Sequence, residues 1–212
     1  MMITLTPKQL NKCQGIIVWD FDGVLFDTER LKQDFEEIFR QKNIDLQAVM
    51  KGSLHIKYIG RPFSLSFFLR TLKENGHSVS ELFVRRKYQT LLQNEYLDPQ
   101  ADRILRFLRR KGYLLTLLSF GVPSFQYPKI KIGCGKNFMR HFIKIRVTKN
   151  PKFMFIKNIH RKFPQLPIYF IDDTSEHITL VKKHIPFVKT IHFTSSHTLP
   201  KVAKYIVSHA KN

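Results

Sequence analysis

Two aspartates separated by one residue follow a short apolar run near the start of the chain. Asp20 and Asp22 come directly after residues 16–19, Ile-Ile-Val-Trp, and precede Gly23. A β-branched and aromatic run of this kind is typical of a strand buried on both faces of a parallel sheet. Strand alternation puts both carboxylates on one side, and ligands bind at this end of strands in open α/β sheets. Two carboxylates there predict a hard-cation site, with Mg²⁺ the usual ion beside phosphate.

The alternative is a strand end with solvated turn aspartates. It is the weaker interpretation, because four apolar residues precede the pair and a glycine follows it.

Polar residues also end two later apolar runs. Ser119 follows residues 114–118, and a hydroxyl at such a position can hold a phosphoryl oxygen. Asp172 and Asp173 follow residues 168–171 and supply the further oxygen ligands that Mg²⁺ at the first pair needs.

Two lysines lie between these runs, near the start of a predicted helix. Lys149 and Lys152 flank Pro151. A lysine there can neutralise crowded carboxylates and phosphate.

The pattern of elements predicts an α/β fold with a Rossmann-like parallel sheet. Strands alternate with helices in the second half of the chain, which indicates βαβ units. The expected strands are 16–19, 113–118, 142–147, 168–171 and 187–192. One helix is expected to end at 111–112, before the second strand, and the others are expected at 123–130, 151–163, 175–184 and from 198 onward.

Residues 28–96 show only helical spacing, with helices expected at 28–43, from 64 to about 74, and from 78 or 80 to 92. We therefore predict a core domain of residues 1–28 and 98–212, with an inserted α-helical cap domain of residues 29–97 over the site.

Composition narrows the class of protein. The 212 residues are 43% hydrophobic and 25% charged, as in globular chains, and the formal charge is +20. The basic residues are scattered, so nucleic-acid binding is possible but not favoured.

Cys13 and Cys134 lack metal or disulfide spacing and predict free thiols in a reducing compartment. With no apolar leader and no run of transmembrane length, we expect a cytoplasmic protein without membrane association. Oligomeric state is not readable from the sequence.

The ordered motifs resemble the haloacid dehalogenase-like (HAD) hydrolase superfamily over nearly the whole chain. The first matching stretch is Asp-Phe-Asp-Gly-Val-Leu at 20–25, and Phe-Asp-Thr-Glu at 26–29 continues it as in members with a helical cap. Ser119 matches the second motif, and Ile-Asp-Asp-Thr at 171–174 matches the fourth. Such proteins carry a similar helix and loop at the positions of Gln126, Lys129-Ile130 and 138–142. Either Lys149 or Lys152 fits the third motif, and Lys149 is slightly preferred.

The resemblance implies a Mg²⁺-dependent phosphatase. Asp20 would be the nucleophile that forms an aspartyl-phosphate, and Asp22 the acid and base. Mg²⁺ would be held by Asp20, the Asp22 carbonyl and Asp173, while Asp172 orients its ligands. Dehalogenating members lack an acid at the position of Asp22, so this residue favours phosphoryl chemistry.

The substrate implied is a small anionic phosphorylated metabolite, bound also by Ser119 and the motif lysine. Cap cations able to contact a second anionic group are Lys57, Arg61, Arg70 and Arg85. There are two alternatives. One is a sugar phosphomutase of the same superfamily, and the other is a basic protein on this fold that binds nucleic acid or nucleotides.

Overall fold

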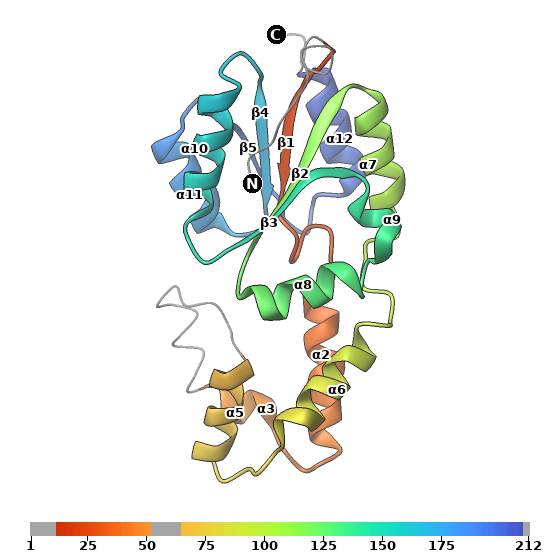
Figure 1. Cartoon of the computed structure of the whole chain (residues 1–212), viewed down its shortest axis with the longest axis vertical. Helices are drawn as coiled ribbons and strands as arrows, with labels where there is room; N and C mark the ends of the chain where they lie inside the picture. The colour runs from red at the N-terminus through yellow and green to blue at the C-terminus, as the bar shows by residue number, and fades with distance from the viewer. Residues whose placement is uncertain (1–11, 52–64, 210–212) are drawn as a thin grey trace.

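The core of the molecule is a five-stranded parallel sheet. The computed structural model describes residues 12–51 and 65–209 (Figure 1). Its strand order is β3-β2-β1-β4-β5, with β1 at the centre. The strands are β1 (Gly15–Trp19), β2 (Tyr113–Phe120), β3 (Phe142–Thr148), β4 (Ile168–Asp172) and β5 (Lys189–His192), and every pairing is parallel. All five residues of β1 and of β4 are buried, as expected for strands covered on both faces.

Helices cover both faces of this sheet (Figure 1). On one face, α7 (Ala101–Arg110) and α12 (Leu199–Ser208) pack on a cluster that includes Ile17 and Trp19. On the other, α10 (Lys152–Lys162) and α11 (Ser175–His184) pack on Ile16 and Val18. Side chains from β1 therefore enter both hydrophobic layers.

A second group of helices lies beyond the carboxyl ends of the strands (Figure 1). It comprises α2 (Thr28–Arg40), α3 (Leu46–Lys51), α5 (Leu65–Glu74) and α6 (Glu81–Leu91). These helices share their own apolar cluster around Phe39, Phe68 and Leu72. The two chain segments that join this group to the sheet meet at Phe26 and Leu97, which form an antiparallel bridge. We call the four helices the cap.

Helix α8 (Pro123–Lys131) runs beneath the strand ends, between the sheet and the cap (Figure 1). Its Phe125 ring stacks on Tyr88 of α6, with ring centroids 4.4 Å apart. The short helix α9 (Gly135–Met139) follows and leads into β3. Helix α8 of the core therefore contacts the cap.

The expected α/β fold is confirmed, with differences in the elements, and the strand expected at 113–118 continues to Phe120. The short helices α3 and α9 were not predicted, because six and five residues are too few to show a helical period. Strand β5 begins at Lys189 rather than Phe187, whose side chain is 55% exposed. The expected helix start at Ser64 lies outside the described residues. Among the described residues, we find no helix with the length and apolar character needed to cross a membrane.

Candidate active site

The sheet brings the two acidic pairs together. β1 and β4 are neighbours, with Trp19 paired to Ile171, and the Asp20 amide donates to the Ile171 carbonyl at 2.9 Å. Asp20 and Asp172 therefore leave adjacent strands at the same level. Both are buried, with exposed fractions of 4% and 0%.

A buried lysine bridges these carboxylates. Lys152 Nζ lies 2.6 Å from Asp20 Oδ1 and 2.7 Å from Asp172 Oδ2, and its side chain is 1% exposed. Lys152 is the first residue of α10, which packs on the sheet, so its side chain reaches back to the strand ends. Lys149 is exposed and comes before the helix. The structure therefore brings Lys152 to the carboxylates, rather than the slightly preferred Lys149, because Lys152 begins α10.

The charges of the cluster do not balance. Burial and the neighbouring Asp172 raise the pKa of Asp20 well above its usual range despite the contact with Lys152. Burial also acts on Asp172, but Lys152 and His177 outweigh it and hold the pKa of Asp172 below its usual value. One ammonium thus serves two buried carboxylates, and the raised pKa of Asp20 means that its ionised form is disfavoured without a further cation.

The oxygen donors at this point fit a hard divalent cation. Asp20, Asp172 and Asp173 each place one carboxylate oxygen so that all three atoms lie within 4.8 Å of one another. Such a set of oxygen ligands suits Mg²⁺, and a divalent cation there would stabilise the ionised forms of the crowded carboxylates. The side chain of Asp22 does not belong to this cluster, so a contribution from Asp22 rests on its backbone carbonyl.

A tight turn after β1 sets the approach to the cluster. The amides of Leu25 and Phe26 both donate to the Phe21 carbonyl at 3.0 Å, which closes the loop. Gly23 within it has φ +72°, a conformation that side chains rarely adopt. A Cβ at Gly23 would also overlap Oδ2 of Asp173. Glycine is required here for both reasons.

We expect Gly23→Ala to weaken Mg²⁺ binding, because the new methyl group displaces Asp173. The measurement is the rise in melting temperature on adding Mg²⁺, which reports binding to the folded state. Gly76→Ala is the matched control, since Gly76 has φ +81° but open space where a Cβ would lie. Both variants should lose about 1–2 kcal/mol to backbone strain. Only Gly23→Ala should lose the Mg²⁺ response; an equal response in both would contradict the placement of Asp173 at the metal.

Three side chains hold the carboxylate of Asp22. Thr28 Oγ1 donates to Oδ1 at 2.6 Å, Gln126 Nε2 donates to Oδ2 at 2.7 Å, and Lys129 Nζ contacts Oδ1. Burial raises the pKa of Asp22, but the Lys129 ammonium and these hydrogen bonds outweigh it, so the pKa lies below its usual value. At neutral pH Asp22 is a carboxylate in this arrangement.

Sequence reasoning assigned no role to Gln126 and Lys129. They fall one helical turn apart, at 126 and 129, on a helix whose apolar residues follow no clear stripe. Their role could have been inferred from their spacing, which places Gln126 and Lys129 on the same helix face as Ile130, a residue that is 1% exposed. Polar residues on a buried face imply a buried partner.

Ser119 lies near the strand end as expected, but inside the sheet. It pairs in register with Val147 of β3 and is fully buried. Its hydroxyl has no hydrogen-bond partner within the described part of the chain. The next two residues, Phe120 and Gly121, line the cleft described below. A buried hydroxyl without a partner is costly, which is consistent with a ligand-binding role for Ser119.

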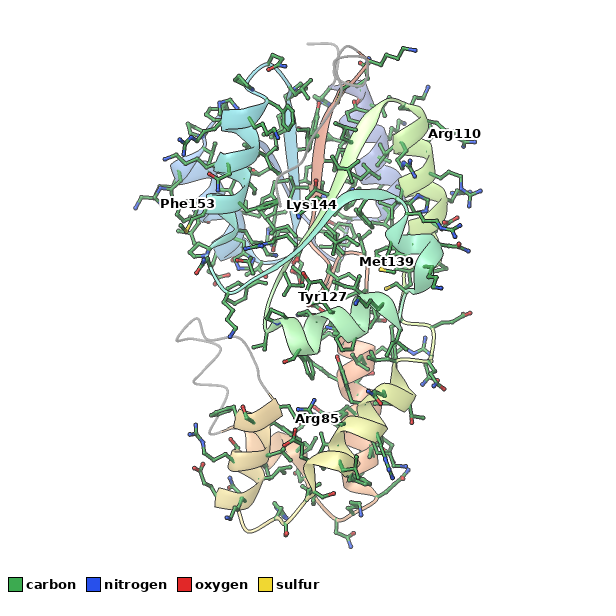
Figure 2. The ribbon with its side chains drawn as sticks, in the orientation of Figure 1. Arg85, Arg110, Tyr127, Met139, Lys144 and Phe153 are labelled. Atoms are coloured by element: carbon green, nitrogen blue, oxygen red, sulfur yellow. The ribbon has the colours of Figure 1, made fainter. Side chains whose placement is uncertain are left out.

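A cleft of about 1520 Å³ between core and cap opens onto the carboxylates. Its walls include Asp20, Asp22 and Asp173 from the core and Phe35, Phe67 and Phe68 from the cap. Among the described residues, eight acidic side chains line it, against four Lys and Arg. Most described basic side chains, such as Arg110 at the end of α7, point to solvent elsewhere (Figure 2). The described lining of the cleft is therefore acidic, in contrast to the net charge of +20.

The cap cations give little support for a second anion site. Arg70 and Arg85 are exposed and pair with Glu74 and Glu81 on their own helices. Arg85 is labelled among the cap helices in Figure 2. Lys57 and Arg61 lie outside the described residues.

Comparison with known proteins places the fold. No family model matches the chain, and no curated protein matches it by sequence. Solved structures do match over most of their length. A HAD-hydrolase from Bacillus subtilis bound to magnesium is 16% identical with a TM-score of 0.59, covering 91% of this chain and 98% of that one.

Two further structures carry different chemistries. An L-2-haloacid dehalogenase from Xanthobacter autotrophicus, with chloropropionic acid covalently bound, is 16% identical with a TM-score of 0.60, covering 92% of this chain and 83% of that one. A structure described as a β-phosphoglucomutase from Thermotoga maritima is 15% identical with a TM-score of 0.58, covering 89% and 91%. The chain has the haloacid dehalogenase-like fold, as its motifs indicated. At these identities the likeness shows the fold and leaves the reaction open.

Proposed function

We propose that the protein is a Mg²⁺-dependent phosphomonoester phosphatase that acts through an aspartyl-phosphate on Asp20. The observation that carries this proposal is the convergence of Asp20, Asp172 and Asp173 around the buried Lys152 at the carboxyl end of the sheet. Asp22 beside them supports phosphoryl transfer, because a departing alkoxide needs a proton and a halide does not.

In the first step, a carboxylate oxygen of Asp20 attacks phosphorus. An oxygen–phosphorus bond forms, and the bond from phosphorus to the leaving oxygen breaks. Asp22 donates a proton to that oxygen. Asp22 is ionised in the free protein, but an approaching phosphate dianion raises the pKa of a nearby carboxyl group and so favours the protonated form.

In the second step, Asp22 takes a proton from water as the water attacks phosphorus. The bond between Asp20 and phosphorus breaks, and inorganic phosphate leaves. The lowered pKa of Asp22 favours the ionised form that this step requires.

Binding groups complete the proposal. Lys152 already contacts Asp20 and would neutralise the transferred phosphoryl group, together with the Ser119 hydroxyl. Mg²⁺, when held by Asp20, Asp173 and the Asp22 carbonyl with Asp172 orienting them, supplies positive charge that reduces repulsion between two anions. The magnesium in the Bacillus subtilis structure of the same fold is consistent with this assignment.

The test is phosphate release from a panel of phosphomonoesters, sugar phosphates and nucleotides, with and without Mg²⁺. We expect release that requires Mg²⁺ and is abolished by EDTA, and the ranking of the panel would identify the substrate class. Release that is unaffected by EDTA would contradict the metal-dependent mechanism.

A sugar phosphomutase remains the second candidate, since the same fold occurs in a structure described as a β-phosphoglucomutase. It would isomerise a sugar phosphate in the same panel without releasing phosphate. A folded protein that does neither, but binds nucleic acid with an affinity that collapses as salt rises, would support a binding role for the positive charge.

A further inference from the structure

The lysine that contacts Asp22 is as deeply buried as the lysine that contacts Asp20. Lys129 is 2% exposed, and its ammonium lies 4.9 Å from the Phe26 ring centre and 5.7 Å from that of Phe21. Within residues 12–51 and 65–209, Asp22 is the only carboxylate that forms an ion pair with it. Burying an ammonium among aromatic rings is costly unless it is paired. A methionine of similar length would fill the same space without that cost, so the charge itself calls for an explanation.

Both oxygens of Asp22 are constrained from the same helix. Lys129 contacts Oδ1 and Gln126 donates to Oδ2 at 2.7 Å, so the plane of the carboxylate is fixed by α8. Gln126 is held in turn, because it packs so closely on Gly121 that an added Cβ there would lie 2.7 Å from Gln126 Cγ. Thr28 Oγ1 adds a bond at 2.6 Å from the first turn of α2. The side chain of Asp22 remains 25% exposed, and it lines the cleft.

We propose that Lys129, assisted by Gln126, is a positioning residue that orients the Asp22 carboxylate toward the leaving oxygen of the substrate. The inference rests on the phosphatase function proposed above and adds a residue to it. Proton transfer depends strongly on geometry, so a carboxylate free to rotate would lose efficiency as an acid. The loss should therefore depend on how much the leaving group needs a proton.

Two substrates separate this role from a structural one. p-Nitrophenyl phosphate releases a weakly basic phenolate that needs little protonation, whereas β-glycerophosphate releases a strongly basic alkoxide. We compare kcat/KM, which reports only the steps up to departure of the leaving group. Lys129→Met should lower kcat/KM for β-glycerophosphate by about 100-fold and that for p-nitrophenyl phosphate less than about tenfold. Gln126→Leu should shift the same ratio in the same direction by a smaller factor.

Lys131→Met is the matched control. Lys131 is exposed on the same helix, with its ammonium 5.9 Å from the Tyr127 ring centre, and the change removes the same charge. Both substrates should be turned over as by the wild type. Because the two rates come from one preparation, their ratio does not depend on the fraction of folded protein.

A double-mutant cycle tests whether Lys129 acts through Asp22. In an Asp22→Asn background, Lys129→Met should cause no further loss on β-glycerophosphate, because the group it positions has gone. If the losses from Asp22→Asn and Lys129→Met multiply in the double variant, the inference is overturned. Equal losses of Lys129→Met on the two substrates, or no loss on either, would overturn it as well. If the wild type releases phosphate from no ester of the panel, the proposed function fails and the inference falls with it. If the wild type hydrolyses both of these esters, only the role of Lys129 is at stake.

Discussion

Replacing Asp20 with asparagine should abolish phosphate release, by at least about 10³-fold, and leave the fold intact. An amide oxygen is too weak a nucleophile to attack phosphorus, and the nearby carboxylate of Asp22 is already held by Thr28, Gln126 and Lys129. Lys152 would keep its 2.7 Å contact with Asp172, so the site would not collapse. The measurement is single-turnover phosphate release by Asp20→Asn and by the wild type. Substantial activity in the variant would remove Asp20 as the nucleophile.

The same variant should be at least as stable as the wild type in EDTA at neutral pH. Burial raises the folded-state pKa of Asp20, so above its unfolded-state pKa of about 3.9 the folded protein binds more protons than the unfolded chain. The contribution of Asp20 to stability therefore falls as pH rises through this window. Asp20→Asn removes that penalty, and any gain in melting temperature should shrink as pH is lowered toward 4. A variant much less stable at pH 7.5 than the wild type would contradict the pKa direction.

Lys152→Met should inactivate and destabilise the protein, whereas Lys149→Met should do neither. The first change leaves two buried carboxylates without their shared cation, which costs about 3–5 kcal/mol. It also removes the charge that would meet the phosphoryl group, with an expected loss of about 100-fold or more in kcat. Urea unfolding in EDTA and phosphate release below the melting temperature measure the two effects.

Lys149→Met is the matched comparison, because it makes the same substitution three residues earlier at an exposed position. Its stability should stay within about 0.5 kcal/mol of the wild type. An active Lys152→Met together with an inactive Lys149→Met would reverse the assignment made from the structure.

The sheet and its acidic cluster were predictable because they depend on strand ends. In parallel strands, residues that follow an apolar run emerge at one edge of the sheet, and Asp20 and Asp172 approach each other there because β1 and β4 are adjacent. The helices with a clear apolar stripe, such as α7 and α2, were predictable for a similar reason.

The helix-borne residues were harder to place. Choosing between Lys149 and Lys152 depends on where α10 begins, and a boundary error of a few residues reverses the choice. The contacts of Gln126 and Lys129 with Asp22 join residues more than a hundred positions apart. No local period records such a pairing, since it depends on how α8 crosses the strand ends.

The most direct test of an aspartyl-phosphate is to trap it with borohydride during turnover of a phosphomonoester. Borohydride reduces an acyl phosphate to an alcohol, which converts an aspartate into homoserine at the labelled position. We predict homoserine at position 20 in the wild type with Mg²⁺ and substrate, and none without substrate or in Asp20→Asn. Sustained phosphate release with no modification at Asp20, or with modification at another carboxylate, would contradict the proposed mechanism.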